Sequence, residues 1–158
     1  MKPQLFLNKV IVKKSSIDGY GVFADKCINN GEIVEECYVL IAKGGDDGMA
    51  DYYFDADGEY GVLLGYGSIY NHSDSPNATY SFDTKNNMAT IKAVRAIEKN
   101  EEIFITYGDN WFGDRGLKPK KPSIWRRILN PATSVLMRGF IGCALLLLSI
   151  QLIKMVLT

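Results

Sequence analysis

Residues 70–77 read Tyr-Asn-His-Ser-Asp-Ser-Pro-Asn, and they are the most informative part of the chain. Asn-His-Ser followed by Pro-Asn is a spacing that no ordinary core element requires. Two further signatures lie on either side of it: Gly-Tyr-Gly-Val-Phe-Ala at residues 19–24 and Glu-Glu-Ile-Phe-Ile-Thr-Tyr-Gly at residues 101–108. Each is a weak signal alone, since a Gly-x-Gly is common in turns. The three in this order along one chain are a specific pattern.

The residues around these signatures predict one compact domain that is mainly β (α+β). Short apolar runs, rich in β-branched residues, predict strands at residues 10–12, 33–41, 78–82, 89–94 and 102–107. Turns that contain Gly, Asn and Asp separate these runs. Residues 61–69 are the best helical segment, although their glycines weaken that prediction.

Charge is divided unequally along the chain. All 18 acidic residues lie at or before Asp114, together with ten of the 18 Lys and Arg residues, so residues 1–114 carry a net charge of 10 − 18 = −8. An acidic domain suits a basic partner, such as a Lys/Arg-rich peptide, and argues against direct nucleic-acid binding. Acidity that merely keeps the domain soluble explains the charge equally well.

The cysteines and the single histidine argue against a metal site. Cys27, Cys37 and Cys143 are odd in number and contain no C-x-x-C pair, so neither a disulfide framework nor a zinc cluster is implied. We expect Cys27 and Cys37 to be buried apolar thiols in a reducing compartment. His72 is the only histidine of the chain, which excludes a multi-histidine metal site.

Composition changes after Phe112. Residues 113–123 contain two prolines and four basic residues, which is the composition of a linker rather than of a packed core element. The sequence therefore divides into a domain at residues 1–112, a linker at 113–123 and a C-terminal membrane-anchor segment at 124–158.

Residues 135–157 predict a transmembrane helix. A helix of these 23 residues spans roughly 34 Å, enough to cross the hydrocarbon core of a bilayer. The basic residues before it place the domain on the cytoplasmic side, and its position in the sequence predicts a tail anchor. Four consecutive leucines without a polar face disfavour the alternative, a C-terminal helix packed on the domain.

The three signatures resemble those of the SET-domain protein-lysine methyltransferases. Residues 6–112, about two-thirds of the chain, are most similar to the minimal viral SET histone H3 lysine methyltransferases, which are dimeric. The resemblance is also carried by residues 10–15 (VIVKKS), 31–37 (GEIVEEC) and 107–109 (YGD). It implies a β-clip fold of small sheets with a pseudoknot, and a homodimer. It does not extend to the tail after Asp114.

The resemblance implies methyl transfer from S-adenosylmethionine to a lysine of a basic protein, with the histone H3 tail as preferred substrate. It makes Tyr107, together with Tyr20, catalytic, and it makes His72 a binding residue rather than a proton carrier. The residues that it implies for donor binding are Gly19, Tyr20, Gly21, Asn71, His72, Tyr107 and Trp111, with Trp111 or Phe112 closing over the adenine. Those that it implies for the lysine channel are Tyr52, Tyr66 and Ile105. Since Ile105 cannot hold a water molecule, we expect products beyond monomethyl-lysine.

Two alternatives stay open. The first is membrane-tethered methylation of a non-histone protein, and the second is a catalytically silent SET-like module that binds peptides. For a viral protein, the host nucleus or cytoplasm replaces the membrane as the location. The acidic stretch at residues 46–59 is either a solvated loop or a contact for arginines of a basic peptide.

Overall fold

The computed structural model describes residues 7, 9–42 and 47–121 of the chain. The chain divides into a unit Met1–Lys121 and a unit Pro122–Thr158, so every described residue belongs to the first unit. The transmembrane segment predicted at residues 135–157 lies outside the described residues. Among the residues that are described, no helix is long and apolar enough to cross a membrane.

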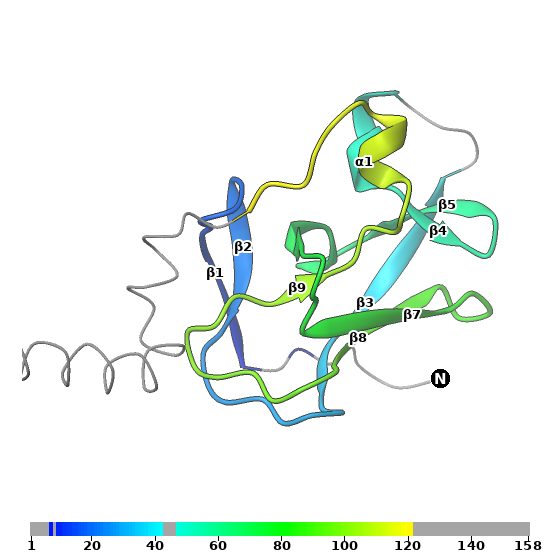
Figure 1. Ribbon diagram of the computed structural model, residues 1–158. Helices are drawn as coiled ribbons and strands as arrows, with labels where there is room; N and C mark the ends of the chain where they lie inside the picture. Colours follow the sequence, from blue (N-terminus) through cyan, green and yellow to red (C-terminus); the bar gives the residue numbers. More distant parts are fainter. Residues whose placement is uncertain (1–6, 8, 43–46, 122–158) are drawn as a thin grey trace, which may run out of the picture. The chain divides into compact units, whose positions relative to one another are not determined.

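The described residues form small β-sheets joined by short helical turns, which confirms the prediction of a mainly β domain (Figure 1). An antiparallel pair contains β1 (Val10–Lys14) and β2 (Tyr20–Ala24). A parallel pair contains β6 (Asn71–His72) and β9 (Phe104–Ile105). A five-stranded antiparallel sheet has the order β4 (Phe54–Ala56), β5 (Glu59–Leu63), β3 (Ile33–Ala42), β8 (Met88–Ala93) and β7 (Ala78–Asp83). The helical turns are η1 (Asp47–Tyr52), η2 (Gly67–Ile69) and α1 (Trp111–Asp114).

The helix predicted at residues 61–69 is wrong. The segment instead contains the end of β5, a turn at Gly65 and the short turn η2. Gly61 pairs with Ile41 of β3, and a Cβ atom at Gly61 would lie 2.9 Å from the side chain of Val39. Gly65 has a φ of +83°, which a regular helix does not accommodate. The glycines therefore serve a close strand contact and a turn.

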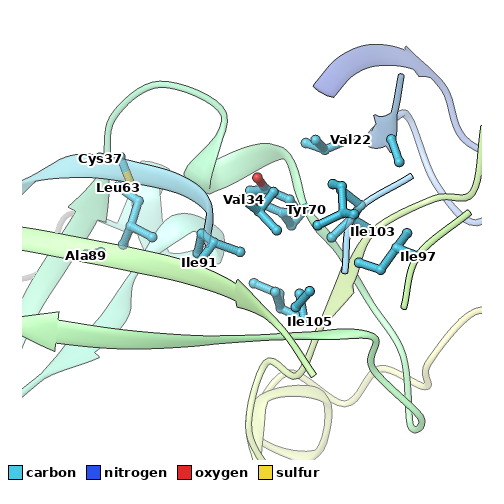
Figure 2. Close-up of a cluster of buried hydrophobic side chains, with 14 of the residues drawn as sticks. Val22, Val34, Cys37, Leu63, Tyr70, Ala89, Ile91, Ile97, Ile103 and Ile105 are labelled. Carbon is cyan, nitrogen blue, oxygen red and sulfur yellow. The ribbon is translucent and has the colours of Figure 1, made fainter. Parts of the chain in front are cut away.

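Apolar side chains from β2, β3, β5, β7, β8 and β9 form one buried cluster (Figure 2). Val22, Ile91, Ile97 and Ile105 in this cluster have no exposed surface. Cys37 also lies here, and burial raises the pKa of its thiol to about 12. Cys27 is exposed, so the prediction of two buried thiols is wrong for this residue, which precedes the first buried position of its loop.

The side chain of Asn77 joins the signature at residues 70–77 to the signature at residues 101–108. Its side chain is completely buried, and its Nδ2 atom donates to the Glu102 carbonyl oxygen at 2.9 Å. Its Oδ1 atom accepts from the backbone N–H of Phe104 at 2.7 Å. These bonds fix the segment after Glu101 beside the loop that follows β6, and the parallel β6–β9 pair lies next to them. The pseudoknot implied by the resemblance stays a prediction.

Candidate active site

Two cavities share one wall beside Tyr107. The first, which we call the glycine-side cavity, has a volume of about 790 Å³, and Gly19, Asn71 and His72 are among the residues that line it. The second, the aromatic cavity, has a volume of about 180 Å³ and a lining dominated by Tyr and Phe side chains. Both cavities are lined by Asp51, Tyr52, Ser68, Tyr107 and Trp111.

The two glycines of the first signature have different reasons to be glycine. Gly19 has a φ of +45° and open space where a Cβ atom would lie, so its backbone can approach a ligand. Gly21 lies within β2, where a Cβ atom would collide with the carboxylate of Glu102 and lie 3.0 Å from Asn71 Nδ2. Gly19 therefore contributes to the cavity, while the missing side chain of Gly21 leaves space for the buried carboxylate of Glu102.

Asn71 and Glu102 form a buried hydrogen-bonded pair next to Gly21. Asn71 Nδ2 lies 2.8 Å from Glu102 Oε1 and 3.1 Å from the carbonyl oxygen of Tyr20. The other carboxylate oxygen of Glu102 accepts from the Ser15 hydroxyl at 3.0 Å. Burial raises the pKa of Glu102, and the hydrogen bonds from Asn71 and Ser15 oppose that rise. The amide nitrogen of Asn71 thus fastens the glycine turn to the strand that leads to Tyr107.

Both ring nitrogens of His72 have partners within the protein. Nδ1 accepts from the backbone N–H of Tyr107 at 3.1 Å, so the ring proton belongs on Nε2, which lies 3.2 Å from Asp74 Oδ1. The ring also packs edge-on against Phe112, with a centroid separation of 4.8 Å. His72 therefore holds the backbone of Tyr107 in place.

Tyr107 lies at the junction of the two cavities. Its hydroxyl donates to the carbonyl oxygen of Tyr70 at 2.8 Å. Burial raises the pKa of Tyr107 to about 12, and the nearby charges of Asp18 and Glu102 act in the same direction. The hydroxyl is therefore protonated at neutral pH and donates its one proton to Tyr70, so its oxygen is left to accept a hydrogen bond. Its ring packs on that of Trp111, with centroids 5.0 Å apart.

The residues after Trp111 fold back onto the domain. The Arg115 guanidinium lies 2.9 Å from Asp51 Oδ1, donates to the carbonyl oxygen of Ala50 at 2.6 Å and stacks 4.2 Å above the Trp111 ring. Lys120 pairs with Asp18 at 2.7 Å. The linker predicted at residues 113–123 stays a prediction; its residues up to Lys121 lie in the unit Met1–Lys121. Basic side chains of this segment form ion pairs with carboxylates of the acidic domain. Composition alone does not reveal these pairs.

An open groove of about 670 Å³ adjoins the aromatic cavity and shares Tyr107 and Trp111 with it. Four carboxylate residues are part of its lining: Asp55, Glu59, Asp109 and Asp114. Asp55 and Glu59 come from the acidic stretch that the sequence singled out. Arg115 also lines the groove, so the lining carries four acidic residues and one basic residue beside the aromatic cavity.

Comparison with known proteins identifies the family. The family model of the SET domain matches residues 19–108, more than half of the chain. The chain belongs to the SET-domain family. The matched residues of this SET domain contain all three sequence signatures, from Gly19 to Gly108.

Two proteins similar to this SET domain have names that concern histones. The chain is 41% identical over 63 residues to the H3 lysine-37-specific histone-lysine N-methyltransferase of Schizosaccharomyces pombe, across 39% of this chain and 43% of that protein. It thus spans less than half the length of this curated relative. A crystal structure of a candidate histone methyltransferase of Plasmodium falciparum matches with 34% identity and a TM-score of 0.57. That match covers 65% of this chain and 100% of the other.

Most of the residues predicted for the site of this SET domain lie together. The glycine-side cavity is lined by Gly19, Tyr20, Asn71, His72, Tyr107 and Trp111, and Tyr52 lines both cavities. Tyr20 does not line the aromatic cavity. Gly21 lies below the glycine-side cavity against Glu102. In the part of the chain that the structure describes, no three His, Cys, Asp or Glu side chains could hold a metal ion.

Tyr66 and Ile105 do not line either cavity. Tyr66 is half-buried and packs against the hydrophobic cluster, and Ile105 is completely buried within it. β9 ends at Ile105, so the strand alternation that would bring Ile105 to the same face as Tyr107 does not continue to Tyr107.

Sequence analysis missed several residues of the aromatic cavity and its wall. The missed aromatic residues are Tyr53, Phe54, Tyr70 and Tyr80. Phe54 and Tyr80 meet edge to face with centroids 5.3 Å apart. A usable signal was the run Tyr52-Tyr53-Phe54 within an acidic stretch. No local sequence pattern predicts the position of Arg115 beside this site, because its partner Asp51 is 64 residues away.

Proposed function

We propose that this SET domain transfers a methyl group from S-adenosylmethionine to a lysine side chain, with the tail of histone H3 as preferred substrate. The observation that carries the proposal is the meeting of the two cavities at Tyr107. The glycine-side cavity has the volume of a small-molecule site. The aromatic cavity is narrow and suits the apolar stem of a lysine. The histone-lysine methyltransferase named among the similar proteins supports this reaction.

The lining of the glycine-side cavity fits the methyl donor. Gly19 leaves room for close backbone approach, and Asn71 and His72 line the same cavity. Trp111 and Phe112 offer rings that would lie against the adenine. When bound, S-adenosylmethionine supplies an electrophilic methyl group.

The residues of the chain then prepare the lysine. A lysine amine has a free pKa of about 10.4 and must be neutral to attack carbon. Burial among the aromatic side chains favours the neutral form, because it disfavours charge. The Tyr107 hydroxyl, held at the junction of the cavities, orients the amine toward the donor. Alignment of this kind supplies much of the rate enhancement in a displacement reaction.

The preference for a basic peptide is supported by the acidic groove beside the aromatic cavity. The direct test is a methyl-transfer assay with the full chain, radiolabelled donor and core histones. We expect label in histone H3 and none in an H3 whose target lysine is replaced by arginine. Donor binding without label in any protein would contradict the proposal and favour a peptide-binding module.

We expect S-adenosylmethionine to stabilise the full chain against thermal unfolding. A ligand that binds only the folded state adds about 2.7 kcal/mol at 100 times its dissociation constant. Thermal unfolding in mild detergent, with and without donor, measures this. His72→Ala should shrink the shift, since His72 lines the cavity and holds Tyr107. An unchanged unfolding temperature at saturating donor would refute donor binding.

A second candidate is methylation of a non-histone protein by a membrane-tethered enzyme, and the apolar segment at residues 135–157 favours it. We propose that this segment spans a membrane with the SET domain on the cytoplasmic side. We expect the full chain to stay with cell membranes in alkaline carbonate, because a spanning helix is released only by detergent. Release into the carbonate supernatant would overturn the spanning segment. The homodimer stays a prediction of the resemblance, testable by sedimentation of the full chain in detergent.

A further inference from the structure

A buried carboxylate lies near the start of β3 and lines neither cavity. Glu35 is only 3% exposed. Its Oε1 atom accepts from the backbone N–H of Tyr66 at 2.9 Å, and its Oε2 atom accepts from the Tyr70 hydroxyl at 2.9 Å. Burial raises the pKa of Glu35, while these two hydrogen bonds oppose the rise. Burial of a carboxylate costs a fold free energy, which hydrogen bonds to the carboxylate offset.

The turn between β5 and β6 is shaped around this carboxylate. Gly65 has a φ of +83°, and a Cβ atom at Gly65 would lie 2.6 Å from Glu35 Oε1. Gly67 lies against Leu63, and a Cβ atom there would be 3.1 Å from Cys37 Sγ. Side chains at these positions would therefore push the turn away from Glu35. The two glycines let the backbone close onto β3 just before it reaches Tyr70.

Tyr70 connects the carboxylate to the proposed catalytic tyrosine. Its ring is 2% exposed and belongs to the buried cluster in Figure 2. Its hydroxyl bonds to Glu35 at one end, and its backbone carbonyl accepts the hydrogen bond from the Tyr107 hydroxyl at the other. A shift of the Tyr70 ring would move this carbonyl, and the Tyr107 hydroxyl would follow it.

We propose that Glu35 is a positioning residue for Tyr107. It acts through the Tyr70 hydroxyl and the Tyr66 amide, which together fix the carbonyl that orients the Tyr107 hydroxyl. The effect on rate rests on the proposed methyl transfer, whereas the geometric link does not. Glu35 itself touches neither cavity, and so it does not contact the reacting atoms.

The test uses Tyr70→Phe in the full chain, which keeps the ring and the backbone carbonyl and removes only the bond to Glu35. We expect a single-turnover rate about tenfold lower at saturating donor and peptide, with donor affinity unchanged, because small misplacements of a catalytic group are costly. Ile97→Val is the matched control. It trims a fully buried side chain elsewhere in the core and should cost comparable stability with parental rate.

A double mutant separates positioning from general loosening of the fold. If the link acts through the Tyr107 hydroxyl, Tyr70→Phe should cause no further loss of rate in a Tyr107→Phe background. The same tenfold loss in that background would overturn the inference. So would a parental rate in Tyr70→Phe. If Tyr70→Phe does not fold, Glu35→Gln replaces it, since it keeps the side-chain volume and alters the same bond, with an expected loss of about threefold.

A second readout does not need methyl transfer. With 3-fluorotyrosine placed at position 107, the ¹⁹F resonance reports the surroundings of the Tyr107 ring. We expect Tyr70→Phe or Glu35→Gln to move this resonance and Ile97→Val to leave it unchanged. An unmoved resonance would overturn the positioning role even in an active enzyme. A moved resonance in a chain that methylates nothing would refute the proposed function and leave the geometric link standing.

Discussion

Tyr107→Phe is expected to lower the single-turnover rate of methyl transfer about 10²-fold while leaving fold and donor binding intact. Phenylalanine keeps the ring that packs on Trp111 and stacks with Phe112. The lost hydroxyl is the group that the Tyr70 carbonyl holds at the junction of the two cavities. If the hydroxyl interacts most strongly in the transition state, its loss appears in kcat, and one such preorganised group is typically worth on the order of 3 kcal/mol.

The measurement is a single-turnover rate with radiolabelled donor at saturating donor and peptide. Tyr38→Phe is the matched control, because Tyr38 lies exposed on β3 and lines neither cavity nor the groove. Its rate should equal that of the parent. A Tyr107→Phe enzyme with near-parental rate would remove Tyr107 from the catalytic role and leave its position at the junction a matter of packing.

Gly21→Ala is expected to lower the free energy of unfolding by about 3 kcal/mol, the largest stability effect that we expect of a single methyl group in this domain. The new Cβ atom would collide with the Glu102 carboxylate and crowd Asn71 Nδ2. To remove this collision, either β2 must move or the hydrogen bonds from Asn71 and Ser15 to Glu102 must break. Overpacking alone costs 1–3 kcal/mol, and loss of partners for a buried carboxylate adds to it.

Gly19→Ala provides the comparison, two residues away in the same turn. Its Cβ atom would meet nothing within 4 Å, so only the positive φ of +45° opposes it. We expect a loss of about 1 kcal/mol from this backbone strain. Chemical denaturation of both variants measures the difference. Equal losses for the two would show that strain in the turn, rather than the collision with Glu102, governs this region.

The long strands of the domain could be predicted because their information is local. β3, β7 and β8 coincide closely with runs of β-branched and apolar residues. The run predicted at residues 102–107 contains β9, but β6 and the β6–β9 pairing could not be predicted, since β6 has only two residues and exists because β9 is present. Asn71, His72 and Tyr107 were found through signatures, whereas Arg115 and Glu35 act through partners distant in sequence. Local sequence patterns do not reveal contacts between residues that are far apart in the sequence.

The parallel pairing of Asn71–His72 with Phe104–Ile105 also sets an order of events during synthesis. Closing a loop of this length costs entropy that only the finished contacts repay. Strands β1 to β5, β7 and β8 have all their pairing partners before β9 is synthesised, but β6 and the site do not. The backbone of Tyr107 reaches His72 only after the last signature has emerged. A chain that lacks this signature therefore has most of the scaffold but cannot assemble the site around Tyr107.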